Sequence, residues 1–213
     1  MYKNYKYLVL ITCFMSVLVV GLGAYTRLSD AGLGCPDWPG CYGFLTVPKH
    51  ETALLHVEQN YPDMMFEAAK AWKEMIHRYF AGALGLFILA LFVLAWLKRQ
   101  YPTTPVKLTL LLLLLVVFQA ALGMWTVTMN LQPLVVMGHL LGGFSILACL
   151  WWLRLIILNE KSLYKSPAAL RRKNMVVVGL VILCLQIALG GWVSSNYAGL
   201  ACVGFPSCNG SLL

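Results

Sequence analysis

Five long apolar segments restrict the fold of this chain of 213 residues more than any other feature. Each is about 20 residues long, which as a helix crosses the roughly 30 Å hydrocarbon core of a bilayer. Because unpaired backbone groups are costly in lipid, such segments cross it as helices. The sequence therefore predicts an all-α integral membrane protein. The segments are residues 7–26, 77–97, 108–128, 134–153 and 175–195.

Composition agrees with this interpretation, since 60% of the residues are hydrophobic and 11% are charged. The first segment follows Lys3 and Lys6, as the apolar run of a secretory signal peptide would. Its length of about 20 residues exceeds the roughly 7–15 of a signal peptide, and an Ala-x-Ala cleavage site is missing. We therefore interpret it as a retained transmembrane helix.

The net charge of +8 comes from basic residues that are unevenly distributed among the predicted loops. If the N-terminus is cytoplasmic, 11 of the 16 Lys and Arg residues face the cytoplasm. Loops rich in Lys and Arg stay on the cytoplasmic side, so this orientation is favoured. Seven of the eight carboxylates then lie outside, Glu160 being the exception. Basic residues arranged in this way do not indicate nucleic acid binding.

A motif with two cysteines occurs twice, each time directly after a long apolar segment. AGLGCPDWPGCYG at 31–43 returns as AGLACVGFPSCNG at 198–210, which indicates duplication of a larger unit. Both copies fall on the predicted outer, oxidising face, where disulfides persist. A disulfide in each loop is therefore favoured over redox-cycling thiols or a metal site, for which Cys-x-x-Cys spacing is typical. The cysteines are Cys35 and Cys41 in the first copy and Cys202 and Cys208 in the second.

Two histidines lie within the apolar segments, where ionisable residues point to function. His77 is expected at the outer end of the second segment and His139 one to two turns into the fourth. Both segments run inward, so the two imidazoles are expected at similar depth in the outer leaflet. A histidine pair on facing helices suits axial ligation of a haem. The alternative is that His77 only marks the interface and His139 hydrogen-bonds a neighbouring helix, and the matched pair favours the haem.

Charged residues near His77 agree with a haem. Glu74 precedes it by three residues and therefore shares its helix face. Glu-x-x-His is also half of a di-iron site, but that site needs further carboxylates, and the third and fourth segments contain neither Asp nor Glu. A porphyrin brings its own nitrogen ligands, and its propionates pair with arginines near the aqueous boundary. Arg27 and Arg78 lie there, as propionate partners or as interfacial anchors.

Two further patterns surround the histidines. His139 lies in GHLLGGF, whose glycines allow close helix packing or leave room for a flat macrocycle. Gln-x-Ala-Leu-Gly-x-Trp occurs on the third segment, at 119–125, and on the fifth, at 186–192. Its Gln and Trp are expected near the depth of the histidines. The tryptophans either belong to an interfacial aromatic belt or line a cofactor pocket.

The polar loop 44–71 carries the other two histidines, His50 and His56. We expect both to be solvated, because neither stands in the spacing of a ligand. The length of the loop leaves room for a short amphipathic segment over the site.

Taken together, these motifs resemble those of the haem A synthase family, membrane enzymes of cytochrome oxidase biogenesis. The resemblance covers nearly the whole chain and rests on YTRLSDAGLGCPDWPGCYG, EMIHR, QAALGMWTV, GHLLGGF and QIALGGWVSSNYAGLACVGFPSCNG. It implies two similar four-helix bundles in a bacterial inner membrane. It also implies oxidation of the C8 methyl of haem O to the formyl group of haem A, with the oxygen coming from water.

The resemblance also implies roles for single residues. His77 and His139 match the histidine pair that holds the substrate haem in the family, and Glu74 matches the carboxylate associated with activity. Cys35 and Cys41 match the cysteines of the first outer loop, whose disulfide passes electrons or shapes the loop. The implied partners are the farnesyltransferase that makes haem O and the cytochrome oxidase assembly factors.

The resemblance implies a domain order of three parts. Residues 1–160 form a four-helix haem-binding bundle, residues 161–173 a basic cytoplasmic linker, and residues 174–213 the fifth helix and second cysteine loop of an incomplete second bundle. In the family, the second bundle supplies another histidine pair, which binds a haem B cofactor, and these ligands are absent from the 213 residues. A truncated gene or a frameshift would explain this departure, and pairing of two chains in a homo-oligomer would compensate for it.

Three functions from different classes follow. The first is a haem O oxidising enzyme, or its N-terminal portion. The second is a quinone-linked thiol oxidase, which the missing Cys-x-x-Cys motif disfavours. The third is a haem-binding assembly protein without turnover of its own.

Overall fold

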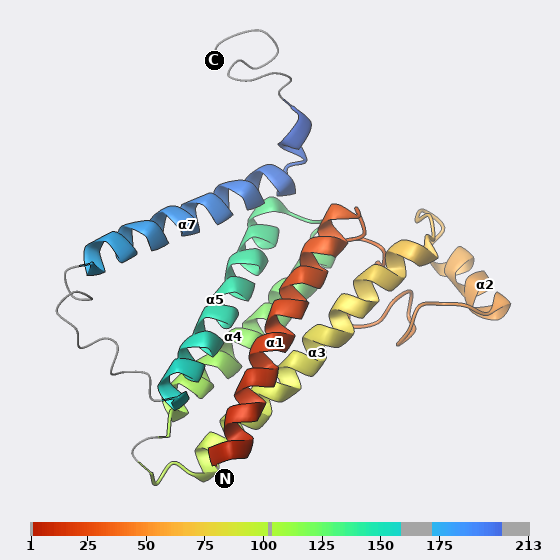
Figure 1. The fold of residues 1–213 in the computed structure, drawn as a ribbon. Coiled ribbons are helices and arrows are strands. Elements are labelled where there is room, and N and C mark those ends of the chain that lie inside the picture. The colour runs from red at the N-terminus through yellow and green to blue at the C-terminus, as the bar shows by residue number, and fades with distance from the viewer. Residues whose placement is uncertain (1, 102–103, 159–171, 202–213) are drawn as a thin grey trace, which may run out of the picture.

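The computed structural model describes residues 2–101, 104–158 and 172–201, in which helices are joined by loops (Figure 1). Among these residues, five helices are long and apolar enough to cross a membrane, namely α1, α3, α4, α5 and α7. Each overlaps one of the five predicted segments, so the predicted all-α membrane fold is confirmed. The helices are α1 (Tyr2–Leu28), α2 (Glu51–Asn60), α3 (Ala68–Leu97), α4 (Val106–Thr128), α5 (Pro133–Leu158) and α7 (Lys173–Ser195), followed by the 3₁₀ turn η2 (Ala198–Leu200).

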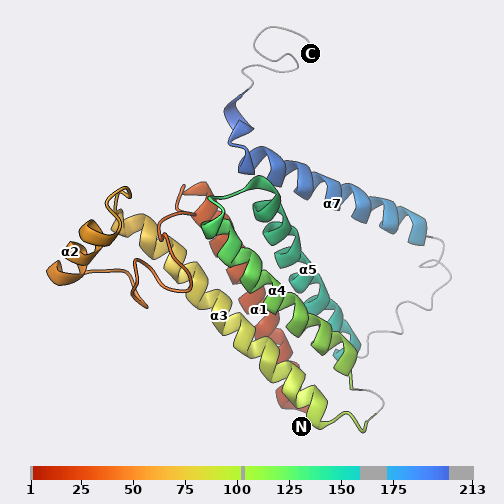
Figure 2. The same cartoon turned by 180° about the vertical axis from the view of Figure 1, so that it is seen from behind.

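Four of the long helices form a closed bundle in the described chain. α1 packs against α3 and α5, and α4 packs against the same two helices. α3 and α5 therefore lie diagonally opposite each other. Of the long helices described, α7 contacts α5, and it is tilted away from the bundle axis (Figure 1, Figure 2).

The apolar core of the bundle lies in the half that is remote from the first cysteine motif. It includes Ile88, Leu91 and Leu112 together with Leu150 and Leu153, all of which are buried. The outer faces of the same helices are apolar as well, and they expose large side chains. Such faces are suited to contact with lipid, where apolar exposure has no cost. Phe14, Leu86, Leu114 and Trp152 are among these exposed residues.

The limits of the helices differ from the predicted ones, most of all in α3. α3 begins at Ala68, nine residues before His77, whereas the prediction started this helix at His77. The prediction was wrong because it followed apolarity, and the first turns of α3 carry charged residues but bury Ala71 against the first cysteine motif. At 1.5 Å per residue, His77 lies about 13 Å inside the helix rather than at its end. α1 likewise starts at Tyr2, and α5 continues to Leu158.

The cysteine loop, residues 29–50, connects α1 to α2 and is closed by a disulfide between Cys35 and Cys41. The disulfide that the sequence favours is therefore confirmed for the first copy of the motif. The second pair, Cys202 and Cys208, lies outside the described residues.

A small apolar cluster under the cysteine loop is centred on Tyr42, whose side chain is buried. Its ring meets Tyr61 and Phe66 edge-on, with ring centroids 5.2 and 5.3 Å apart. The Asp37 carboxylate accepts hydrogen bonds from the backbone N–H groups of Tyr42 and of the following residue. Burial raises the pKa of the Tyr42 phenol, and neighbouring carboxylates add to this effect. The loop thus has a core of its own, separate from that of the bundle.

α2 is a short helix in the region where the length of the loop leaves room for a short amphipathic segment. It buries Val57 in the cluster under the cysteine loop, and His50 and His56 are exposed, as expected. The predicted position over the site is wrong, because α2 lies beyond α3 at the side of the bundle (Figure 1, Figure 2). Its buried residue Val57 contacts the loop cluster, and the ring of His56 meets that of Phe44 in the cysteine loop edge-on.

Gly34→Ala should destabilise the protein strongly, because a Cβ at residue 34 would lie 2.6 Å from the backbone carbonyl carbon of Lys70 on α3. Two backbone segments cannot move apart as a flexible side chain can, so the cost should reach about 3 kcal/mol, the upper end of overpacking effects. Gly82→Ala, on α3 itself, is the control, since nothing lies within 4 Å of its Cβ position. Thermal unfolding in detergent should give a lower Tm for the first variant alone. Equal Tm values would show that the loop does not rest on α3.

Candidate functional site

His77 of α3 and His139 of α5 meet across the diagonal of the bundle. Their ring centroids are 6.5 Å apart, and the ring planes make an angle of 85°. The helices themselves do not pack on each other in the described chain, so these side chains bridge the space between them. The structure therefore brings together the two histidines that the sequence places on facing helices.

Each histidine ring packs against a glycine of a neighbouring helix. A Cβ on Gly23 of α1 would lie 3.0 Å from Cε1 of His77, and a Cβ on Gly123 of α4 would lie 3.4 Å from Cε1 of His139. A larger residue at either position would push the ring away. These two glycines therefore make the room in which the imidazoles face each other.

The histidine pair fits a metal ion that brings further ligands of its own. Nδ1 of each ring is buried and, within the described part of the chain, has no hydrogen-bond partner. A separation of 6.5 Å between the ring centroids would leave room for a metal ion to which each ring contributed a nitrogen at about 2 Å. No group of three or more His, Cys, Asp or Glu that could hold a metal occurs among the described residues. A macrocycle that supplies the equatorial ligands therefore suits this pair better than a bare metal ion does.

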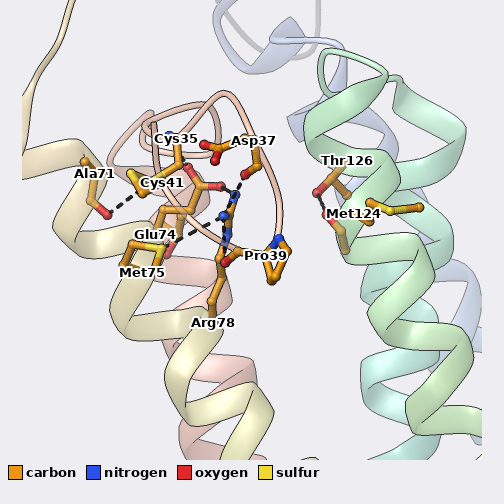
Figure 3. Close-up of polar contacts among 12 residues, drawn as sticks. Cys35, Asp37, Pro39, Cys41, Ala71, Glu74, Met75, Arg78, Met124 and Thr126 are labelled. Atoms are coloured by element: carbon orange, nitrogen blue, oxygen red, sulfur yellow. Dashed lines mark hydrogen bonds and ion pairs between the residues drawn. A yellow bond between two sulfur atoms is a disulfide. The ribbon is translucent and has the colours of Figure 1, made fainter. Parts of the chain in front are cut away.

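Glu74 lies one turn before His77 on α3, and its carboxylate reaches the cysteine loop (Figure 3). One oxygen accepts a hydrogen bond from the backbone N–H of Cys35 at 2.9 Å, and the other forms an ion pair with Arg78. Both side chains are largely buried, with 6% of Glu74 and 11% of Arg78 exposed. Glu74 thus couples the helix that carries His77 to the loop that carries the disulfide.

Arg78 completes this connection from the same face of α3. Besides its ion pair with Glu74, its guanidinium donates hydrogen bonds to the backbone carbonyls of Asp37, at 2.8 Å, and of Gly40 (Figure 3). Carbonyl oxygens inside a closed loop need donors when water is excluded, and Arg78 provides them. In this structure the guanidinium is therefore committed to the cysteine loop.

Arg27, the other predicted propionate partner, lies at the end of α1 and faces α7. It donates a hydrogen bond to the backbone carbonyl of Ser194, and its guanidinium carbon lies 4.1 Å from the centre of the Tyr197 ring. Its Nε is buried without a hydrogen-bond partner among the described residues. Arg27 thus links α1 to α7 and keeps one donor unused.

The tryptophans of the repeated Gln-x-Ala-Leu-Gly-x-Trp pattern do not line the site. Trp125 is 39% exposed and Trp192 is 45% exposed. Of the two interpretations that the sequence left open, the interfacial belt is therefore the better one for both residues.

The site contains Gly23 and Gly123, which the sequence analysis did not identify, and Gln119, which it placed near the depth of the histidines without giving it a role. Gln119 and Gly123 belong to the same repeated pattern and lie four residues apart, hence on one face of α4. Repetition of a Gln and a Gly at this spacing was the signal that could have identified them. Gly23 had no such signal, because its contact with His77 depends on how α1 packs on α3.

Comparison with known proteins agrees with the resemblance seen in the sequence. A family model described as cytochrome oxidase assembly protein matches residues 6–213. A heme A synthase of Shewanella oneidensis is 51% identical over 205 residues, which are 96% of this chain and 61% of that protein. Heme A synthases of Granulibacter bethesdensis and Shouchella clausii are 28% and 27% identical, over 94% and 99% of this chain and 58% and 65% of their own lengths. No solved structure matches.

The chain thus spans about three fifths of the length of the curated relatives that it matches. The family model nevertheless covers it from the first transmembrane helix to its last residue, through both histidines and both cysteine motifs. The chain therefore belongs to the family of cytochrome oxidase assembly proteins.

Proposed function

We propose that this chain binds haem O between His77 and His139 and takes part in the oxidation of its C8 methyl to the formyl group of haem A. The observation that carries the proposal is the pair of buried imidazoles with ring centroids 6.5 Å apart across the bundle. The names of the relatives, heme A synthase, agree with it. Neither the thiol oxidase nor the non-catalytic assembly protein is supported by these comparisons.

The reaction determines what the protein has to supply. Conversion of a methyl and a water molecule to a formyl group releases protons and an equal number of electrons, and the electrons pass to an acceptor in the membrane. The protons need a nearby base. We propose Glu74 for this role, because its carboxylate shares a helix face with His77 and is paired with Arg78.

The propionates of the haem need cationic partners near the same end. We propose Arg27 first, since its Nε has no partner among the residues that the structure describes. Arg78 is the second candidate, and it would have to share its guanidinium with the loop carbonyls that it holds. The Cys35–Cys41 disulfide then shapes the loop through which these groups are positioned.

We propose that residues 1–160 form the haem O unit, that residues 161–173 link it to a second unit, and that residues 174–213 begin that unit. The haem B cofactor expected of the family needs a second histidine pair, and residues 174–213 contain no histidine. The uneven distribution of Lys and Arg supports a cytoplasmic N-terminus and a cysteine loop on the outer face of a bacterial inner membrane. The haem O-producing farnesyltransferase and oxidase assembly factors are the proposed partners, and a homo-oligomer is compatible with this organisation.

Coexpression of the chain with a source of haem O should yield haem A or hydroxylated haem O, resolved by reverse-phase chromatography of extracted haems. The product should disappear in His77→Ala, because oxidation requires the bound substrate. Haem O bound with a two-histidine spectrum but without either product above background would refute turnover by this chain. It would leave haem binding as its function.

A further inference from the structure

Gln119 is a buried polar side chain next to the histidine pair, and its amide donor is unused. It lies on α4, is 7% exposed, and its Nε2 has no hydrogen-bond partner among the residues described. Leaving a buried amide donor unpaired costs about 1–3 kcal/mol. An apolar residue at this position would avoid that cost, so the unused donor is suited to an acceptor on a bound group.

The position of the amide relative to His139 follows from two reciprocal contacts. His139 of α5 packs on Gly123 of α4, and Gln119 of α4 packs on Gly142 of α5 so closely that a Cβ on that glycine would overlap Nε2. His139 also interacts with the backbone of Gln119. Gln119 lies about one turn from Gly123 on α4, and Gly142 lies about one turn from His139 on α5. The amide is therefore about one helical turn from the His139 ring, on the side away from the cysteine loop.

We propose that the Nε2 amide of Gln119 donates a hydrogen bond to the oxygen that the reaction installs on the C8 substituent of the bound haem. The inference rests on the proposed function, and it assigns a specificity-determining residue to it. The starting methyl cannot accept a hydrogen bond, whereas the alcohol and formyl oxygens can. Gln119 therefore binds the oxidised forms better than the substrate, and it promotes the reaction to the extent that the hydrogen bond is already made in the transition state.

The test compares two haems in the purified full chain. Haem A carries the formyl oxygen, whereas haem O carries a methyl at the same position, is otherwise identical and serves as the ligand without that acceptor. Gln119→Leu should weaken haem A binding about tenfold, the effect of one hydrogen bond, and should leave haem O binding unchanged. In resonance Raman spectra of bound haem A, the formyl C=O stretch should move to higher frequency in this variant, toward its value in a solvent that donates no hydrogen bond.

The chain offers a matched control in the second copy of the same pattern. Gln186 of α7 is exposed, so Gln186→Leu should change neither the affinities nor the formyl band. If Gln119→Leu does not fold, Gln119→Met keeps the length of the side chain without the donor and is measured in the same way.

Three outcomes are informative. An upward shift of the formyl band with a selective loss of haem A affinity supports the inference. An unchanged formyl band, or equal losses for both haems, overturns it while the proposed function stands. If the unaltered chain binds neither haem with a two-histidine spectrum, the proposed function fails and the inference fails with it.

Discussion

Haem bound to the purified chain should give a low-spin spectrum with two axial histidines, and either His77→Ala or His139→Ala should abolish it. Each substitution removes one of two ligands that face each other at 6.5 Å between ring centroids. Changes around a metal ligand commonly lower metal affinity about 10–100-fold, so loss of a ligand itself should exceed about 100-fold. Optical titration in detergent measures both the affinity and the spin state.

Two controls make this result specific. His56→Ala alters an exposed imidazole on α2 and should leave the spectrum intact. Gly23→Ala places a Cβ 3.0 Å from Cε1 of His77, whereas nothing lies within 4 Å of a Cβ at Gly21 on the same helix. Gly23→Ala should therefore weaken haem binding and Gly21→Ala should not. A low-spin spectrum that survives in both His77→Ala and His139→Ala would refute the site.

Arg78→Met should lower the free energy of unfolding by about 3–5 kcal/mol, because it leaves the buried carboxylate of Glu74 without its partner. The pair is 6% and 11% exposed, so water cannot replace the lost interaction. The same substitution also removes donors from the carbonyls of Asp37 and Gly40. Urea unfolding in detergent micelles measures the change.

The double variant Glu74→Gln with Arg78→Met should recover part of the loss, since it removes the unpaired charge. Arg99→Met is the control, because that guanidinium is exposed beside Trp96 and its loss should cost less than about 0.5 kcal/mol. If Arg78→Met lowered the free energy of unfolding by as little as Arg99→Met does, the ion pair would not hold the cysteine loop.

Glu74→Gln alone should retain the haem spectrum and lower product formation about 100-fold or more if Glu74 accepts protons.

The sequence predicted the membrane-spanning helices well because lipid permits few alternatives. Apolar length located all five spans, and the repeated cysteine motif pointed to the Cys35–Cys41 disulfide. The expectation that His77 and His139 lie at similar depth also followed from the direction of the segments. These features depend on residues near in sequence or on the number of membrane crossings, which a single sequence displays directly.

Features that depend on packing between distant segments could not be predicted. The early start of α3 is stabilised by burial of Ala71 against the cysteine loop, and apolarity gave no sign of it. Arg78 was expected as a propionate partner or an interfacial anchor, but its guanidinium pairs with Glu74 and donates to loop carbonyls about 40 residues away in sequence, with a 2.8 Å bond to that of Asp37. Such pairings become visible only when two helices and a loop are placed in space.

The diagonal placement of α3 and α5 has a consequence for the life of the protein in a cell. These helices do not pack on each other in the described chain and are linked to each other through α1 and α4. A haem ligated by both would therefore add a direct connection between α3 and α5. A ligand present at about 100 times its Kd adds about 2.7 kcal/mol to the stability of the state that binds it. Proteases acting on opened chains respond to such differences. The amount of protein that survives in the membrane would then follow the supply of haem.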